Sequence, residues 1–167
     1  MAKDYGESII DPATARGRDW PCLRQFCVFM ENRVGALHQL MRHLEQHDLR
    51  IVALSVNDAV DFAVARLMVD QTDRAREIFQ LAGLTVIEND ILGVELPDDP
   101  QPYVRICIAL LSAEINIHYT YPLNFRRGGN GAIAIYVDDI DQATAILEAQ
   151  GMTLVTEGDL RQDDEFF

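Results

Sequence analysis

The sequence lacks several features that define specialised classes of protein. No run approaches the roughly 18 consecutive apolar residues that a membrane-spanning helix needs. No basic start followed by a long apolar stretch predicts a secretory signal peptide. Basic residues are few, because 14 Lys and Arg stand against 27 Asp and Glu, for a formal charge of −13. This balance argues against binding to nucleic acid or to an anionic membrane. With no signal peptide and no membrane-spanning segment visible, the cytoplasm is the expected location.

Metal ligands are also scarce. The three cysteines are an odd number without Cys-x-x-Cys spacing, which argues against a disulfide framework and a cysteine-only zinc site. His43 and His47 are four residues apart on a predicted helix, a spacing that can chelate a metal. The zinc-hydrolase helix needs Glu directly after the first His, whereas Leu44 stands here, so an exposed helix face is the favoured interpretation. The sequence predicts no metal and no cofactor.

Catalytic motifs are absent as well. There is no Gly-x-Ser-x-Gly nucleophile elbow, no phosphate-binding loop and no glycine-rich dinucleotide turn. Asp98 and Asp99 could in principle act as acid and base, but adjacent carboxylates on a turn are usually solvated. The sequence therefore predicts no catalytic residue and no enzyme.

Apolar residues make up 49% of the 167 residues, which is enough for a packed core. Alternating and helix-periodic segments predict the order βαββαβ twice. In the first half, strands are predicted at 23–30, 50–56, 62–69 and 85–87, and helices at 36–47 and 71–82. In the second half, strands are predicted at 91–96, 115–121, 132–137 and 153–155, and helices at 102–113 and 139–149.

The two halves align in register. Gly35 aligns with Gln101 and Ile51 with Ile117 at one constant offset along the chain. Gly83 aligns with Gly151 at a slightly larger offset, and a two-residue insertion between the second and third strands accounts for the difference. This internal duplication divides the chain into an N-terminal tail or docking arm (1–22), two repeats (23–90 and 91–160) and a short acidic tail (161–167).

A βαββαβ unit of this length is the ferredoxin-like α+β arrangement. A single copy leaves unpaired sheet edges, which is unfavourable. Two copies in one chain can join edge to edge at high effective concentration. The expected fold is a continuous antiparallel eight-stranded sheet with four helices on one face.

The residues of both repeats resemble the ACT domain family, whose small regulatory modules bind amino acids. The turn Asn32-Arg33-Val34-Gly35-Ala36-Leu37 resembles the family's polar turn before an apolar helix, and 62–69 resembles its third strand. The second repeat has a comparable turn at 97–102 and the strand opening Ile115-Asn116-Ile117. The resemblance covers roughly Leu23 to Leu160 and implies an allosteric regulatory protein that binds a small amino acid.

Neither repeat keeps the whole family pattern. The first repeat keeps Gly35 but has Arg50 where the family often has Asn, and the second keeps Asn116 but has Gln101 where the glycine belongs. Proteins of this kind hold ligands between paired units, with the turn of one facing the strand of another. The resemblance therefore implies a composite site that uses Gly35 with Asn116, and the alternative is that both sites have degenerated.

An amino acid ligand needs backbone N–H groups for its carboxylate, which the turn before Ala36 could supply, and acidic groups for its ammonium, for which Glu31, Asp98 and Asp99 are candidates. The competing interpretation is that each turn is a plain strand-to-helix connector. The predicted ligand-binding residues are Asn32, Arg33, Val34, Gly35, Ala36, Leu37, Asp98, Asp99, Gln101, Asn116, Ile117 and His118.

Two functions follow from the resemblance. The first is an amino-acid-binding sensor or regulatory protein. The second is a regulatory subunit without a ligand of its own, which docks on an amino-acid biosynthetic enzyme such as an acetolactate synthase. Assembly into a homodimer is open under both.

Overall fold

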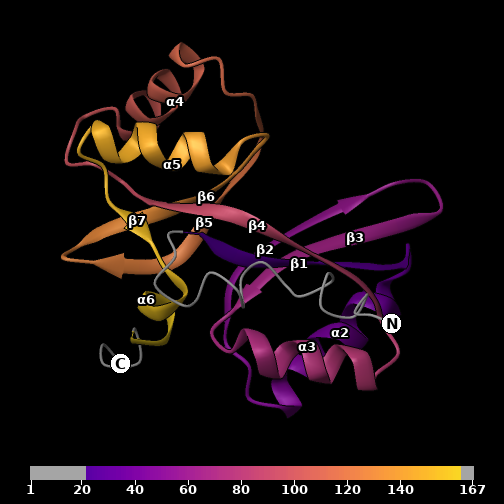
Figure 1. The fold of residues 1–167 in the computed structure, drawn as a ribbon. Coiled ribbons are helices and arrows are strands. Elements are labelled where there is room, and N and C mark those ends of the chain that lie inside the picture. The colour runs from indigo at the N-terminus through magenta and orange to yellow at the C-terminus, as the bar shows by residue number, and fades with distance from the viewer. Residues whose placement is uncertain (1–21, 163–167) are drawn as a thin grey trace, which may run out of the picture.

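A computed structural model of the protein describes residues 22–162 (Figure 1). The predicted N-terminal arm, apart from Cys22, and residues 163–167 of the predicted acidic tail lie outside the described residues. In chain order the elements are β1 (Leu23–Glu31), α2 (Val34–Gln46), β2 (Ile51–Asp58), β3 (Phe62–Val69), α3 (Thr72–Leu81), β4 (Thr85–Glu95), α4 (Pro102–Ser112), β5 (Ile117–Arg127), β6 (Asn130–Val137), α5 (Ile140–Ala149), β7 (Leu154–Val155) and α6 (Glu157–Gln162).

The strands form one antiparallel sheet of seven strands in the order β2-β3-β1-β4-β6-β5, with β7 also paired to β4. The prediction of eight strands is wrong, because the segments predicted as separate strands at 85–87 and 91–96 form the single strand β4. Its first part pairs with β1 as far as Ile91, and its last part pairs with β6 from Leu92. The predicted division between the repeats therefore falls where β4 changes partners. β5 also runs to Arg127, beyond the predicted strand end at Tyr121.

The helices lie on both sides of the strands, not on one face. In Figure 1, α2 and α3 lie below the strands, and α4 and α5 lie above them. The part of the chain that the structure describes contains a fifth helix, the short α6, which the sequence pattern did not predict. No helix among residues 22–162 is long and apolar enough to cross a membrane.

Three apolar clusters explain this layering. One lies between α2, α3 and the strands of repeat 1, around Phe26 and Leu67, and the second lies between α4, α5 and the strands of repeat 2, around Ile106 and Ile133. The third contains Leu23 and other residues from β1, β2 and β3 together with residues from β5 and β6. The helix-free sides of the two halves thus pack on each other, because each half has apolar side chains on both sides of its strands.

The backbone confirms the duplication. Asp48 and Glu114 adopt left-handed conformations with φ of 54° and 60° just after α2 and α4, at the offset that aligns Gly35 with Gln101. Gly83 and Gly151, already aligned in the sequence, do the same after α3 and α5, with φ of 71° and 79°. Left-handed residues commonly end helices, and glycine adopts this conformation without strain. The two offsets therefore describe the three-dimensional repeat as well as the sequence.

Candidate functional site

The α2 turn, residues 31–35, spans the junction of β1 and α2 and contains the predicted site residues Asn32, Arg33, Val34 and Gly35. Asn32 donates a hydrogen bond from Nδ2 to the Ala59 carbonyl at 2.9 Å, which ties the turn to the β2–β3 hairpin. Arg33 is the N-cap residue in an extended conformation, and its side chain makes no capping hydrogen bond. The first N–H groups of a helix have no partner within the helix. The start of α2 therefore offers donors that no N-cap side chain satisfies.

The charges at the α2 turn favour an anion near Arg33. The first turn of α2 contains no acidic residue, and the Arg33 Nε lies 2.6 Å from Glu31 Oε2. This ion pair is exposed, with 56% and 76% of the two side chains accessible, so solvent weakens it. A ligand carboxylate could therefore bind the Arg33 guanidinium and the helix N–H groups, because little free energy is lost when the exposed ion pair breaks. Glu31 could then accept a hydrogen bond from the ligand ammonium.

Gly35 lies inside α2, and its backbone φ angle is not positive. A Cβ on this residue would lie 2.9 Å from Arg33 Nη1, the far end of a flexible side chain. The glycine therefore leaves room for the Arg33 guanidinium over the start of the helix. Of its neighbours, Val34 is 91% exposed, whereas Ala36 is buried and Leu37 packs against the core of repeat 1.

The α4 turn, residues 97–101, occupies the equivalent position in repeat 2 but contains acidic residues and no basic residue. Asp99 accepts a hydrogen bond from the backbone N–H of Gln101 at 2.8 Å, and its other carboxylate oxygen lies 3.0 Å from Arg105 Nη1. Asp98 is adjacent to it in the same turn. Asp99 thus places a negative charge just before α4, which disfavours a ligand carboxylate there, although α4 has no side-chain cap.

The remaining predicted residues lie at the start of β5. The backbone N–H of Asn116 donates to Asp138 Oδ1 at 3.2 Å, and Ile117 packs against the core under α4 and α5. The His118 ring lies 5.3 Å from the ring of Tyr136 and is exposed. Arg50 in repeat 1 makes the same backbone bond as Asn116, to Asp70 Oδ1 at 3.1 Å. The hydrogen bond from the Asn116 backbone N–H to an aspartate therefore has an equivalent in repeat 1 and belongs to the fold of both repeats.

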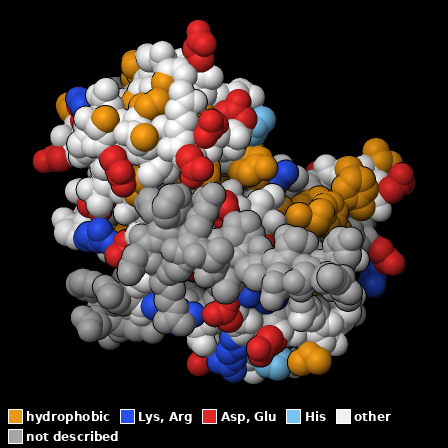
Figure 2. Space-filling model, in the orientation of Figure 1, with side chains coloured by type: hydrophobic (Ala, Val, Ile, Leu, Met, Phe, Trp, Pro, Cys, Tyr) orange, Lys and Arg blue, Asp and Glu red, His pale blue; other side chains and the backbone are white. Residues whose placement is uncertain are grey.

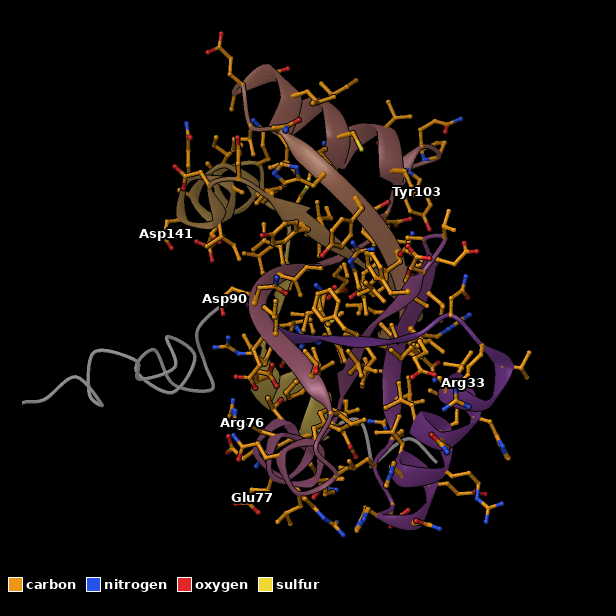
Figure 3. All side chains as sticks on the ribbon, turned by 90° about the vertical axis from the view of Figure 1, so that its right-hand side faces the viewer. Arg33, Arg76, Glu77, Asp90, Tyr103 and Asp141 are labelled. Atoms are coloured by element: carbon orange, nitrogen blue, oxygen red, sulfur yellow. The ribbon has the colours of Figure 1, made fainter. Side chains whose placement is uncertain are left out.

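The α2 turn belongs to repeat 1 and the start of β5 belongs to repeat 2. Figure 3 shows Arg33, at the start of α2, well below Tyr103, at the start of α4, with strands between their helices. Among residues 22–162, no hydrogen bond or ion pair joins Gly35 to Asn116. The composite site that uses both residues stays a prediction.

A polar cluster between the repeats was not predicted. The Gln25 side chain, which is fully buried, donates to Asn89 Oδ1 at 2.9 Å and to the Tyr119 hydroxyl at 2.7 Å. It also accepts a hydrogen bond from the Tyr121 hydroxyl. The Arg66 guanidinium lies 4.3 Å from the centre of the Tyr119 ring, in a cation–π contact. A glutamine inside a largely apolar strand was the signal in the sequence that could have revealed this cluster.

The acidic groups in this cluster are held in their neutral forms. Burial raises the pKa of Tyr119 and of Tyr121, so both phenols stay protonated and can donate hydrogen bonds. Burial likewise raises the pKa of the Cys27 thiol, which disfavours the reactive thiolate. The cluster therefore joins the repeats and is poorly suited to nucleophilic chemistry. Within the described residues, no group of three or more His, Cys, Asp or Glu side chains could hold a metal ion.

Comparisons with known proteins agree with this architecture. The ACT domain pair family matches residues 22–163. The protein BT0572 from Bacteroides thetaiotaomicron has a similar structure, with a TM-score of 0.77 and 22% identity over 84% of this chain and 96% of that chain. The ligand-free regulatory subunit of aspartate kinase from Thermus thermophilus gives a TM-score of 0.54 and 15% identity, over 81% and 94% of the two chains.

The regulatory subunit of aspartate kinase from Thermus flavus gives a TM-score of 0.50 and 18% identity, over 75% of this chain and 88% of that chain. Comparison with curated protein sequences gives no match. At these identities the solved structures show a shared fold, and the family match covers most of the chain. The chain belongs to the ACT domain family, in the form of an ACT domain pair.

Proposed function

We propose that this ACT domain pair is a regulatory protein that senses a small amino acid, and that the ligand carboxylate binds at the α2 turn. The observation that carries this proposal is the contrast between the two turns. Neither helix start has a side-chain cap, but Arg33 lies beside the start of α2, whereas the Asp99 carboxylate lies beside the start of α4 and accepts a hydrogen bond from the Gln101 N–H. One ligand per chain, bound to repeat 1, fits this contrast.

The polar groups around the turn suit a zwitterion. The ligand carboxylate would accept hydrogen bonds from the first N–H groups of α2 and from Arg33. The Glu31 carboxylate would accept a hydrogen bond from the ligand ammonium. Asn116 would complete the site if the two repeats approach each other on binding. A ligand that prefers one arrangement of the repeats shifts the population toward it, which is how such a protein would act allosterically on a partner.

A thermal-shift screen against the twenty amino acids tests this function. A ligand that binds only the folded state raises the melting temperature, by an amount that grows with ligand concentration. Arg33→Ala should remove the shift, and Arg105→Ala serves as the matched control, because Arg105 pairs with an acid at the other turn. No shift with any amino acid would contradict the proposal, and so would a screen in which Arg33→Ala leaves every observed shift unchanged.

The second candidate is a regulatory subunit that docks on a biosynthetic enzyme without a ligand of its own. Exposed apolar side chains favour it: α4 carries Val104, Ile108 and Leu111, which are 48%, 57% and 57% exposed. Figure 2 shows a second apolar patch on the right-hand arm, in the region of the β2–β3 hairpin. Docking predicts that Ile108→Lys abolishes a stable complex with a purified partner, such as an acetolactate synthase, in size-exclusion chromatography. Retention of that complex by the variant would exclude α4 as the docking surface.

A further inference from the structure

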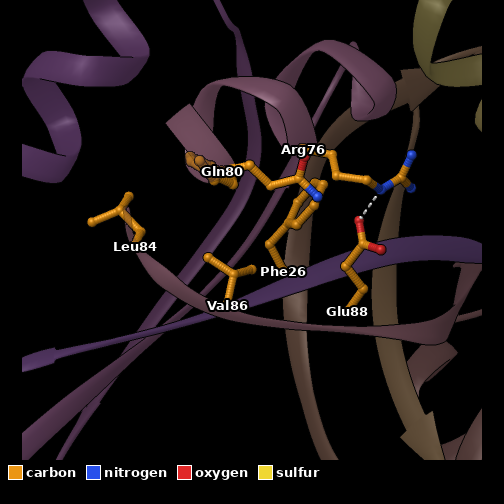
Figure 4. Close-up of a pocket in the computed structure, with 7 residues that line it drawn as sticks. Phe26, Arg76, Gln80, Leu84, Val86 and Glu88 are labelled. Atoms are coloured by element: carbon orange, nitrogen blue, oxygen red, sulfur yellow. Dashed lines mark hydrogen bonds and ion pairs between the residues drawn. The ribbon is translucent and has the colours of Figure 1, made fainter. Parts of the chain in front are cut away.

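A cavity between α3 and the strands of repeat 1 has no role in the proposed function. Its volume is about 200 Å³, far above the ~10–15 Å³ that one water molecule needs. Phe26, Phe79, Leu84 and Val86 form its apolar wall (Figure 4). The two phenylalanine rings pack edge to face with centroids 5.2 Å apart and are fixed in the core. The cavity therefore has a rigid apolar floor of a size that suits a small side chain.

The cavity also has a polar side. Arg76 Nε lies 2.7 Å from Glu88 Oε1, and the two side chains are 25% and 22% exposed. Arg76 Nη1 makes a second ion pair with the more exposed Asp73 at 3.1 Å. Gln80, one helical turn after Arg76, lines the same cavity with its amide. A positive group, a negative group and an amide thus adjoin one apolar hollow.

The backbone explains why these charges meet the apolar wall. Glu88 in β4 lies opposite Phe26 in β1, so both side chains lie on the side of the strands that α3 covers. Arg76 precedes Phe79 by three residues on α3, so both belong to neighbouring turns of the same helix. The charged pair is therefore placed at the cavity by the same elements that form its floor.

Repeat 2 shows that the fold does not require this charged pair. At the offset that aligns Gly83 with Gly151, Arg76 corresponds to Thr144 and Glu88 to Thr156. Thr144 donates its hydroxyl to the Ile140 carbonyl of its own helix at 2.8 Å. The equivalents of Phe79 and Val86, Leu147 and Leu154, are buried in the core of repeat 2. Helix and strands thus pack in repeat 2 without an ion pair, so the pair in repeat 1 needs another explanation.

We infer that the α3–β4 cavity is a second ligand site, which binds a zwitterionic α-amino acid with an apolar side chain. The side chain contacts the floor formed by Phe26 and Phe79. The ligand carboxylate binds the Arg76 guanidinium and the Gln80 amide, and the ligand ammonium binds the Glu88 carboxylate. The site shares no residue with the α2 turn, so binding at one site can be disproved without affecting the proposal for the other.

Methyl-detected NMR of the full chain locates binding directly, with L-leucine as the probe. The expected result is a saturable shift of the Leu84 and Val86 methyl signals, whereas binding at the α2 turn would shift Val34 and Leu37. Three analogues each lack one recognised part: 4-methylpentanoate has no ammonium, 3-methylbutylamine has no carboxylate, and glycine has no side chain. Each should bind at least about tenfold more weakly, because one charge-assisted contact or the apolar contact is lost.

Variants separate a ligand site from a purely structural ion pair. Glu88→Gln should weaken L-leucine binding by about tenfold or more, and Glu77→Gln should not, because Glu77 is exposed elsewhere on α3 (Figure 3). If Glu88→Gln fails to fold, the double variant Arg76→Thr and Glu88→Thr copies repeat 2 and should fold without binding. The inference is overturned if L-leucine leaves the Leu84 and Val86 signals unchanged at 10 mM, on the order of the weakest useful affinity. An equal loss of binding in Glu77→Gln would also overturn it.

Discussion

The two repeats of this chain share a backbone and differ in where they place charge. At the start of the first helix, Arg33 in repeat 1 stands where repeat 2 has Asp99. Under the second helix, repeat 1 has an ion pair where repeat 2 has Thr144 and Thr156. Both repeats still form the same helices, ended by left-handed residues at equivalent positions. The difference teaches that these charges are not needed to specify the fold, which is why they are the best places to look for ligands.

The residues common to both repeats instead hold the strands in place. Asp70 and Asp138 accept the same backbone hydrogen bond, from Arg50 and Asn116, at 3.1 and 3.2 Å. These carboxylates fix the strand that follows the first helix of each repeat. At this position the carboxylate that serves the fold is repeated, whereas Arg33 and the Arg76–Glu88 pair are not.

The largest expected effect concerns the contact between the repeats. Gln25 has Ile91 as its counterpart in repeat 2, so only one repeat supplies the amide that bridges them. Gln25→Ala should lower the free energy of unfolding by about 3 kcal/mol, because Asn89 and the two tyrosine hydroxyls lose a buried partner. Urea unfolding measures this loss. Asn57→Ala is the control, since Asn57 accepts a hydrogen bond from Arg66 at an exposed position. A loss below about 1 kcal/mol would show that the cluster adds little.

The next effect concerns the α2 turn. Arg33→Asp gives repeat 1 the acid that repeat 2 has at the equivalent position. It should weaken binding of the amino acid found in the thermal-shift screen by at least about tenfold, because a charge-assisted hydrogen bond worth roughly 1.5–3 kcal/mol is replaced by repulsion. Isothermal titration calorimetry measures the change. The reverse exchange, Asp99→Arg, leaves the α2 turn intact and should leave the affinity for that site unchanged. Equal effects from both variants would remove the distinction between the turns.

A smaller effect separates the two structural aspartates. Asp70 is buried and also lies near Arg50, with Oδ2 4.0 Å from Nε, whereas Asp138 is exposed. Asp70→Ala should therefore cost about 2 kcal/mol of unfolding free energy and Asp138→Ala about 1 kcal/mol or less. Chemical denaturation of the two single variants gives the comparison. A larger loss from Asp138→Ala would mean that burial does not set the strength of this bond.

Local sequence patterns predicted most of the fold. The spacing of apolar residues located the helices, and Gly83 and Gly151 marked two of the helix ends that the structure contains. These features depend on residues close together in the chain, so periodicity and turn chemistry describe them well. The polar turn before α2 was identified in the same way, but only Asn32 and Arg33 lie between β1 and α2, because the helix begins at Val34 and not at the predicted Ala36.

The rest depends on distant partners. Asn89 and Asp90 have the chemistry of a turn, yet they lie within β4, because Gln25 binds Asn89 and Arg24 lies 3.4 Å from Asp90. These tertiary contacts satisfy polar groups that would otherwise need water. The sequence also showed alternating apolar residues, but it could not show which sheet faces would meet. The helix layers and the hydrogen bond between Asp99 and the Gln101 N–H before α4 therefore became clear only in the structure.

Helix α6 was missed for a similar reason, since it is six residues long and includes a glycine. Leu160 is buried in the core between the repeats, and Arg50 donates to its carbonyl at 3.1 Å. Glu157 accepts hydrogen bonds from the Arg24 backbone N–H at 2.6 Å and from the Thr72 hydroxyl at 2.9 Å. A helix this short is stable only through such contacts.

The smallest expected effect is a change in pH dependence at Glu157, which has Asn89 as its counterpart in repeat 1. Burial raises the pKa of Glu157 above its ordinary value of about 4.5, so the folded state binds this proton more tightly than the unfolded state. The contribution to stability is then present at low pH and is lost as pH rises through the raised pKa. Glu157→Gln copies the uncharged amide of repeat 1 and keeps an acceptor for the Arg24 N–H. The melting temperature of the variant minus that of wild type should therefore be larger at pH 7 than at pH 5. Glu148→Gln, on the exposed side of α5, should show no such change, and an equal change in both variants would mean that net charge, not burial, controls the pH dependence.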